Sequence, residues 1–277
     1  MDAAALPAAL ALAAGGGQGL SPEHRAALAV SLPLLQRDYR FDRLWFWGCI
    51  QGVRGSYYIA EGLRPDRAQP RYRLYSFNCL DWSLLTPASR EMVAQAEQLR
   101  GRFQGDPSYE YNFADISAEA AAKLFEGGKE PVMKEEARLI ATIEQIDRAV
   151  GIIPRGAFVK TPLGSVHENR HFEGLSLSEA KKLSSYFHFT EPVNLKNKTL
   201  LEKANLDPSI DFLDSLEHDI PQGKGSWSIQ LEKGGAVVVL RSLLWLGLTF
   251  YHIPMTKQYG YIYFGTGEKN LDLPFML

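Results

Sequence analysis

The hydrophobic pattern at the start of the chain predicts two short helices followed by a β-hairpin. Residues 2–13 are rich in alanine and leucine, and a run of glycines ends them. In residues 22–36 leucines recur at helical spacing, and Ser21 stands before them as an N-cap. The residue composition then changes from helix-forming to strand-forming. The segments LWFWGCI (44–50) and SYYIA (56–60) are dense in aromatic and β-branched residues. Two such runs around a glycine-containing connector predict a hairpin.

The hydrophobic pattern in the middle of the chain predicts one further strand and a series of helices. Residues 71–77 alternate between apolar and polar side chains, as a half-buried strand does. Residues 88–99 favour a helix, and residues 134–150 predict a longer one with an apolar stripe. Between these helices, residues 114–131 show little hydrophobic periodicity, and we interpret them as a flexible insertion. Short helices are also expected from Ser176 or Ser178, over 197–206 and over 209–217.

The last quarter of the chain has the pattern of an antiparallel meander. Four strand-like runs, SWSIQLE, AVVVLR, LTFYH and YGYIYF, are joined by short connectors. Short connectors imply antiparallel neighbours, since a parallel crossover needs a dozen or more residues. Strands and helices therefore come in blocks, which predicts an α+β fold: a largely antiparallel β-sheet with peripheral helices and a C-terminal β-meander. Residues 1–277 are expected to form one domain, with two lobes as the alternative.

Aromatic side chains of this last quarter form the candidate partner interface. Tyr259, Tyr261 and Tyr263 share one side of their strand, which we expect to be an edge strand. Trp227 and Trp245 belong to the same aromatic-rich region. Tyrosine and tryptophan combine an apolar body with a polar tip, and this combination favours protein interfaces. The alternative is that these five side chains simply pack in the core.

Composition and charge narrow the class of protein. Of the 277 residues, 45% are hydrophobic and 22% are charged, which is ordinary for a soluble globular protein. The formal net charge is −2, and charges of both signs are mixed along the chain. This argues against an electrostatic nucleic-acid or membrane binder, because such proteins carry a basic bias. No apolar stretch is long enough for a membrane span, and Asp2 stands where a signal peptide would be basic.

The cysteines and one histidine also fit a packed intracellular protein. Cys49 and Cys79 are too few for a disulfide scaffold, and we expect buried, reduced thiols. His188 lies in the aromatic run YFHF and is interpreted as a core or interface histidine. The expected location is the cytosol, or an intracellular structure to which the chain is attached.

The segment HENRH (167–171) is the one most similar to a catalytic motif. It matches the H-E-x-x-H pattern, in which two histidines one helical turn apart bind zinc and the glutamate acts as general base. Pro162, Gly164 and Gly174 surround it, so a polar loop or strand is favoured over a zinc metallohydrolase site. GTGEKN (265–270) lacks the spacing of a phosphate loop and predicts a glycine turn. We therefore expect no enzymatic activity, no catalytic or metal site and no cofactor.

Longer segments resemble the family of radial spoke head protein nine homologues, subunits of the motile ciliary axoneme. The resemblance spans the whole chain, and its long ordered matches are more specific than any short motif above. Weaker similarity to the paralogous four/six-type subunits appears in WG…YYIAEG, in GSWSIQ and in the C-terminal strands. The matching segments are RDYRFDRLWFWG (37–48), YYIAEGL (57–63), GDPSYEYN (105–112), IIPRGAFVKTPLG (152–164), FEGLSLSEAKKLSSYFHF (172–189), DFLDSLEHDIPQGKGSW (211–227), RSLLWLGLTFYH (241–252) and YGYIYFGTGEKNLDLPFML (259–277).

This resemblance implies a non-enzymatic structural subunit of the radial spoke head. It implies a role in assembly of the head and in regulated ciliary or flagellar motility. The implied partners are other radial spoke head subunits, including the four/six-type paralogues, and indirectly the central pair apparatus, with no nucleic acid and no membrane. The implied location is the axoneme of the cilium or flagellum, which is part of the cytoskeleton in the cytoplasm. The family offers no catalytic, metal-binding or cofactor residues, so HENRH gains no support from it.

Overall fold

A computed structural model describes residues 1–13, 19–64, 71–113, 132–221 and 225–275 of the chain. The predicted insertion at 114–131 lies outside the described residues. The chain divides into two compact units, which are named here unit 1 and unit 2. Unit 1 consists of Met1–Ala11, Gly17–Asp147 and Ile262–Glu268, and unit 2 consists of Leu12–Gly16, Arg148–Tyr261 and Lys269–Leu277.

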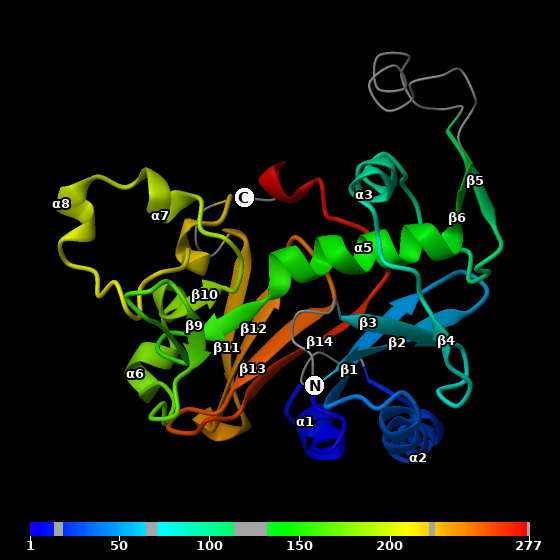
Figure 1. The fold of residues 1–277 in the computed structure, drawn as a ribbon, viewed down its shortest axis with the longest axis horizontal. Helices are drawn as coiled ribbons and strands as arrows, with labels where there is room; N and C mark the ends of the chain where they lie inside the picture. Colours follow the sequence, from blue (N-terminus) through cyan, green and yellow to red (C-terminus); the bar gives the residue numbers. More distant parts are fainter. Residues whose placement is uncertain (14–18, 65–70, 114–131, 222–224, 276–277) are drawn as a thin grey trace. The chain divides into compact units, whose positions relative to one another are not determined.

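An eight-stranded sheet forms the framework of the fold (Figure 1). Its strands, in spatial order, are β11 (Trp227–Glu232), β12 (Val237–Ser242), β13 (Leu248–His252), β14 (Tyr259–Gly265), β1 (Arg43–Gln51), β2 (Ser56–Leu63), β3 (Tyr72–Ser76) and β4 (Ser83–Leu84). The pairs β11–β12, β12–β13, β1–β2, β2–β3 and β3–β4 are antiparallel, whereas β1 and β14 are parallel. The predicted hairpin, meander and α+β class are confirmed.

Strand β14 is not an edge strand, and in this respect the prediction is wrong. It lies between β13 and β1, while β11 and β4 are the edges of the sheet. Its last residues pair with β1 in a register that sets Tyr263 opposite Gly48. This contact joins two segments from opposite ends of the sequence, and no local hydrophobic pattern signals such a long-range parallel pairing.

Gly48 allows β14 to lie this close to β1. Its φ is +145°, and a Cβ at this position would lie 2.1 Å from the backbone oxygen of Tyr263. Any other residue would force the two backbones apart. The register of β1 against β2 also shifts between Phe46 and Gly48. Such a bulge leaves the residue between them, Trp47, free to point its side chain at a neighbouring element.

Two helices cover opposite faces of strand β2 in unit 1. They are α2 (Pro22–Asp38) and α5 (Glu135–Val150). Consecutive side chains of a strand point to opposite faces. The Tyr57 hydroxyl reaches Glu135 of α5, whereas the ring of its neighbour Tyr58 lies 4.7 Å from that of His24 in α2. The predicted helices at these places are confirmed, and Ser21 caps α2 by accepting from the His24 N–H at 3.2 Å.

The carboxylate of Glu135 organises the loop that follows Phe103. Glu135 is fully buried at the first turn of α5, and its oxygens accept from Tyr57 Oη at 2.6 Å and from Tyr111 Oη. Burial raises the pKa of Tyr111 to about 12, and burial likewise raises that of Tyr57, so both phenols remain donors. Three backbone N–H groups complete the set, those of Gln104 (2.7 Å), Gly105 (2.6 Å) and Asp106 (3.1 Å). One side chain thus binds a strand, a helix and the GDPSYEYN loop together.

The other end of α5 is attached to the sheet by Asp147. Its Oδ1 accepts from Trp47 Nε1 at 2.6 Å, and its Oδ2 accepts from the Arg73 guanidinium at 2.6 Å. Arg73 also donates to Glu144, one turn earlier in α5, at 3.1 Å. Polar contacts at both ends therefore fix α5 against β1, β2 and β3.

The remaining elements are short. The predicted helix at 88–99 is α3 (Arg90–Ala96), and the helix expected from Ser176 or Ser178 is the single turn α6 (Leu177–Ala180), capped by Ser176. The residues 197–206 form α8 (Leu200–Lys203), preceded by α7 (Asn194–Asn197). Three two-stranded sheets consist of β5 (Glu110–Asn112) with β6 (Val132–Lys134), β7 (Ile152–Pro154) with β10 (Tyr186–His188), and β8 (Phe158–Lys160) with β9 (Val166–Glu168). The first helix is α1 (Leu6–Ala13), and residues 209–217 lead into a 3-10 turn (Leu216–His218).

Both cysteines are buried free thiols, as expected. Burial raises the pKa of Cys49 and that of Cys79 to about 12, which keeps both protonated at neutral pH. Among the described residues, no helix combines the length and the apolar character needed to span a bilayer.

Replacement of Glu135 by glutamine is expected to destabilise the protein by about 2–3 kcal/mol. The amide nitrogen would face N–H and O–H donors, and the charge that strengthens their hydrogen bonds would be lost. Chemical denaturation of the full chain measures the change. The matched control is Glu136→Gln at the neighbouring half-buried position, which should shift stability by about 0.5 kcal/mol or less. Equal effects of the two substitutions would contradict the role assigned to Glu135.

Candidate protein-interaction site

The five predicted interface residues lie in different environments. Trp227 and Trp245 are buried in unit 2 and line one cavity together. Tyr263 is fully buried in unit 1. Tyr259 and Tyr261 are half-buried, on the same side of β14 as Tyr263. The two tryptophans therefore line one cavity, whereas the three tyrosines share one side of β14, and contact of these residues with a partner stays a prediction.

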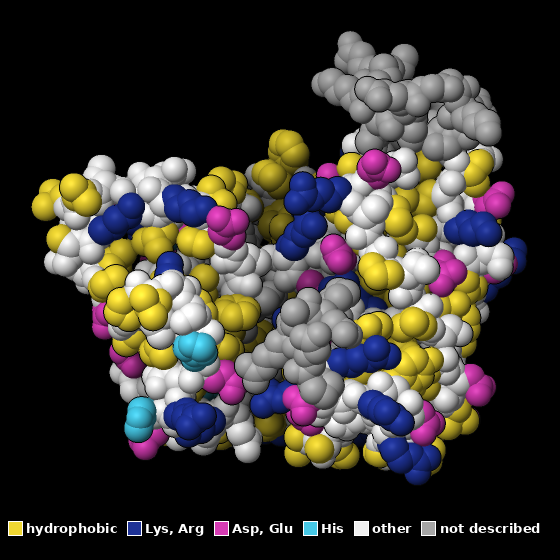
Figure 2. All heavy atoms as spheres, in the orientation of Figure 1, with side chains coloured by type: hydrophobic (Ala, Val, Ile, Leu, Met, Phe, Trp, Pro, Cys, Tyr) yellow, Lys and Arg dark blue, Asp and Glu magenta, His cyan; other side chains and the backbone are white. Residues whose placement is uncertain are grey.

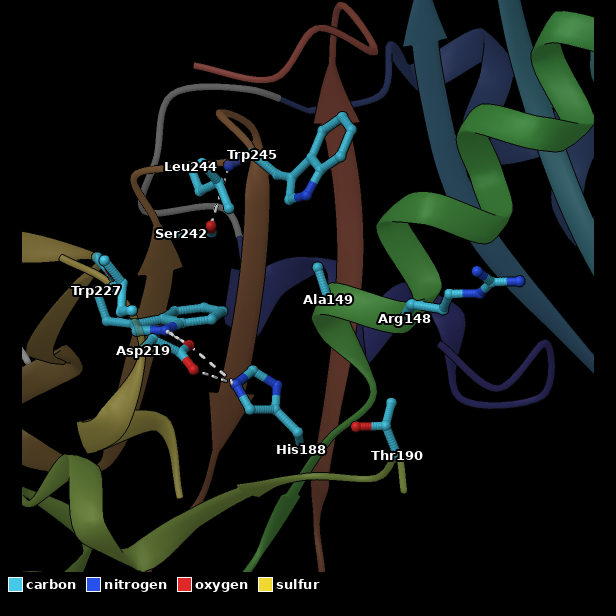
Figure 3. Close-up of a pocket in the computed structure, with 11 residues that line it drawn as sticks. Arg148, Ala149, His188, Thr190, Asp219, Trp227, Ser242, Leu244 and Trp245 are labelled. Atoms are coloured by element: carbon cyan, nitrogen blue, oxygen red, sulfur yellow. Dashed lines mark hydrogen bonds and ion pairs between the residues drawn. The ribbon is translucent and has the colours of Figure 1, made fainter. Parts of the chain in front are cut away.

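The cavity lined by Trp227 and Trp245 has a volume of about 300 Å³ and lies within unit 2 (Figure 3). His188 and Asp219 form a polar part of its wall, and Ile220, whose side chain is 88% exposed, lies beside them. The other lining residues are Arg148, Ala149, Thr190, Ser226, Ser242 and Leu244.

Three short elements bring the polar wall of the cavity together. His188 is the last residue of β10, which pairs with β7 directly after α5. Asp219 ends the 3-10 turn Leu216–His218, which Ser215 caps. Trp227 is the first residue of the edge strand β11. His188, Asp219 and Trp227 therefore each lie at the end of a regular element. The element fixes the backbone of the residue, and its side chain points into the cavity.

Asp219 connects His188 to Trp227 through its carboxylate. His188 Nε2 lies 2.7 Å and 2.9 Å from the two carboxylate oxygens, and Trp227 Nε1 donates to Oδ2 at 2.6 Å (Figure 3). Because a carboxylate accepts, Nε2 of the imidazole carries a proton. The other ring nitrogen, Nδ1, is buried and has no hydrogen-bond partner among the described residues.

The sequence identified part of this arrangement. His188, interpreted from the sequence as a core or interface histidine, is half-buried in β10 and pairs with Asp219, and its contact with a partner stays a prediction. Trp227 and Trp245 were named for their aromatic character. Asp219 was missed, because nothing in the local sequence distinguishes it from other surface aspartates.

The HENRH segment is a strand and turn rather than a helix. His167 and Glu168 belong to β9, and His171 lies in the turn that follows. All three side chains are exposed, and His167 Nε2 lies 3.1 Å from Ser165 Oγ. No group of three or more potential metal ligands occurs within the described ranges. The expectation of a polar loop or strand is confirmed, and nothing supports a metallohydrolase.

A second candidate surface is the apolar tip formed by α7 and α8. Leu200 and Leu201 are 89% and 83% exposed, and Figure 2 shows apolar atoms gathered over α8 beside basic side chains. Asp214 holds the start of α7 by accepting from three consecutive N–H groups, at Val193, Asn194 and Leu195. A capping box of Thr199 and Glu202 fixes the start of α8, which carries the two leucines. Exposed leucines on a fixed backbone are typical of an interaction surface.

His252 fixes the meander from inside. It is fully buried in β13, and its Nε2 accepts from the Leu175 N–H at 3.2 Å. Its Nδ1 lies 3.1 Å from the Gln258 carbonyl, so Nδ1 carries the proton and donates. Burial lowers the pKa of His252, since both nitrogens are satisfied only by the neutral ring. The ring thus joins the β13–β14 connection to the segment that precedes α6.

Comparison with known proteins gives a consistent result over the whole chain. The sequence profile of the radial spokehead-like protein family matches residues 4–100. The chain is 65% identical to the radial spoke head protein 9 homolog of Homo sapiens and 64% identical to that of Bos taurus. It is 54% identical to the homolog of Xenopus tropicalis. Each of these alignments covers 100% of both chains.

Stability is expected to fall as the pH drops below about 6.5, in part through His252. The unfolded chain binds a proton near that pH, whereas the folded state, with its lowered pKa, resists protonation. Denaturation curves between pH 7.5 and 5 measure the loss. His252→Gln should be less stable at pH 7.5 but should lose less stability on acidification, whereas His167→Gln, at an exposed position, should follow the wild type. An unchanged pH slope in His252→Gln would contradict this role.

Proposed function

The chain belongs to the family of radial spoke head protein 9 homologues, and on this basis we propose that it is a non-enzymatic structural subunit of the radial spoke head. Its place is the axoneme of motile cilia and flagella. It contributes to assembly of the spoke head and to regulated motility. The observation that carries the proposal is identity of 52–65% to these homologues over the full length of both chains.

The contacts of α5 support a stiff framework within unit 1. One sheet extends through eight strands, and polar contacts at both ends of α5 fix that helix against it. Buried networks of this kind reduce local motion because every member depends on the position of the others. A part that transmits mechanical contact needs such stiffness.

The proposed partners are other radial spoke head subunits, including the four/six-type paralogues, and through them the central pair apparatus. The edge of the sheet suits such an association. Strand β11 pairs with β12 on one side only, so its other edge can accept a strand from a partner. Leu231 in β11 is 43% exposed and adds apolar surface there. The edge-strand contact first expected for β14 is thus proposed for β11.

Removal of this chain from a ciliated cell is expected to leave cilia that form but beat abnormally. A structural subunit of the head would affect regulation of the beat rather than growth of the axoneme. High-speed video of beat frequency and waveform measures the outcome, with re-expression of the wild-type chain as the control. Wild-type motility in a clean deletion would contradict the proposed function.

Addition of a four/six-type partner subunit is expected to protect residues 226–277, and β11 most strongly, from amide hydrogen exchange. The physical reason is new hydrogen bonding along the free edge of β11. Leu231→Asp should weaken the protection, whereas Leu246→Asp, at a position that is 56% exposed outside the strands, serves as the matched control. Unchanged exchange over 226–277 on formation of the complex would count against this interface.

A further inference from the structure

The apolar tip formed by α7 and α8 exposes large apolar side chains in unit 2. Leu200 and Leu201 are 89% and 83% exposed, and Val193, directly before α7, is 65% exposed. The two leucines are consecutive residues of α8, so their side chains point about 100° apart around the helix. Single exposed apolar residues are ordinary on protein surfaces, whereas a group of them marks an interaction site.

The tip has its shape before any partner binds. A helix of one turn is unstable by itself, and hydrogen bonds at its start stabilise α8. Glu202 Oε2 accepts from the Thr199 N–H and from Thr199 Oγ1, both at 2.8 Å. Lys203 Nζ donates to the backbone oxygen of Lys196 at 3.2 Å, and this bond connects α8 to α7. A partner therefore meets leucines on a preorganised backbone, and little affinity is lost in ordering it.

Lysines beside the leucines give the tip a net positive charge (Figure 2). Residues 191–206 contain three lysines and two glutamates. Lys196 pairs with Glu191 at 2.5 Å, and the other glutamate is engaged in the capping box of α8. Lys198 and Lys203 form no ion pair within the described part of the chain. Two ammonium groups therefore lie beside exposed leucines and are available to carboxylates of a partner.

From this combination we propose that the tip binds a segment of a neighbouring spoke-head subunit in which apolar side chains lie between carboxylates. This step rests on the function proposed above. The apolar side chains of that segment cover Leu200 and Leu201, and its carboxylates pair with Lys198 and Lys203. The leucines supply most of the affinity because they are removed from water, whereas the charges select the partner.

Other occupants would satisfy only part of the tip. A second copy of the tip would set lysine against lysine. A purely acidic segment would leave the leucines in water, and a purely apolar segment would cover ammonium groups without pairing them. An anionic membrane offers both features, but helices that lie on a membrane present a broad apolar face, whereas α8 is a single turn of 4 residues.

The direct test places a photo-crosslinker in the tip and identifies what it contacts. The full chain with Leu200→p-benzoylphenylalanine replaces the wild-type chain in ciliated cells, and mass spectrometry locates the crosslinked residues after irradiation. We expect a segment of another polypeptide in which Asp or Glu lies within about one helical turn of the contacted apolar residue.

The control for this experiment is a crosslinker at a different exposed leucine. Leu163→p-benzoylphenylalanine, at a position between β8 and β9 that is 97% exposed, should not capture the same segment. A crosslink from position 200 to lipid, to a second copy of the tip or to a segment without carboxylates would overturn the proposal. Absence of any crosslink from position 200 would also overturn it.

Charge reversal tests the lysines separately from the leucines. Lys198→Glu together with Lys203→Glu should lower the crosslink yield from position 200 by about fivefold or more, because like charges would then face each other. The matched control is Lys160→Glu together with Lys233→Glu, which reverses two exposed lysines outside the tip and should leave the yield unchanged. All four lysines lie outside the buried core, and denaturation curves of the purified chains check that both variants fold. Equal yields from the two variants would contradict the role of charge.

The two proposals fail in different ways. If position 200 captures no other polypeptide but deletion of the chain still alters the beat, the assignment of the tip is wrong and the spoke-head function stands. If position 200 captures an acidic segment of a protein outside the spoke head, the surface is correctly assigned and the proposed function is wrong.

Discussion

The parallel pairing of β1 with β14 is the contact on which the rest of the sheet depends. It joins an N-terminal hairpin to the last strand of a C-terminal meander, so that two strand systems become one sheet of eight. The pairing requires a glycine at position 48, because Tyr263 leaves no space for a Cβ. Because β1 and β14 lie near opposite ends of the sequence, this contact closes a loop over most of the chain, and that closure has an entropic cost.

Two carboxylates then fix the main helix to this sheet. Glu135 and Asp147 lie at opposite ends of α5 and accept from side chains of β1, β2 and β3. Glu135 adds the loop that carries the GDPSYEYN segment. A buried carboxylate is costly unless each lone pair is satisfied, so these contacts specify one arrangement of helix, loop and sheet.

Much of the fold could be predicted from the sequence, because the relevant signals are local. The hairpin, the meander and α5 follow from the spacing of apolar residues and from caps such as Ser21. The central position of β14 and the role of Glu135 could not be predicted. A tyrosine row has the same appearance on an edge strand and on a central strand, and a glutamate at a helix start usually serves only the helix dipole. Trp227 and Trp245 could be named from the sequence for their aromatic character, but the cavity that they line with Asp219 and His188 could not be predicted, because these residues meet only in the folded chain.

The position of this chain in the spoke head connects these physical features to function. Cryo-electron tomography of axonemes, averaged over the radial spokes, measures that position when the chain carries a small density tag. Tag density is expected in the head of the spoke, and axonemes that lack the chain should lose head density while stalks and doublet microtubules remain. An intact head in those axonemes, or tag density elsewhere in the axoneme, would contradict it.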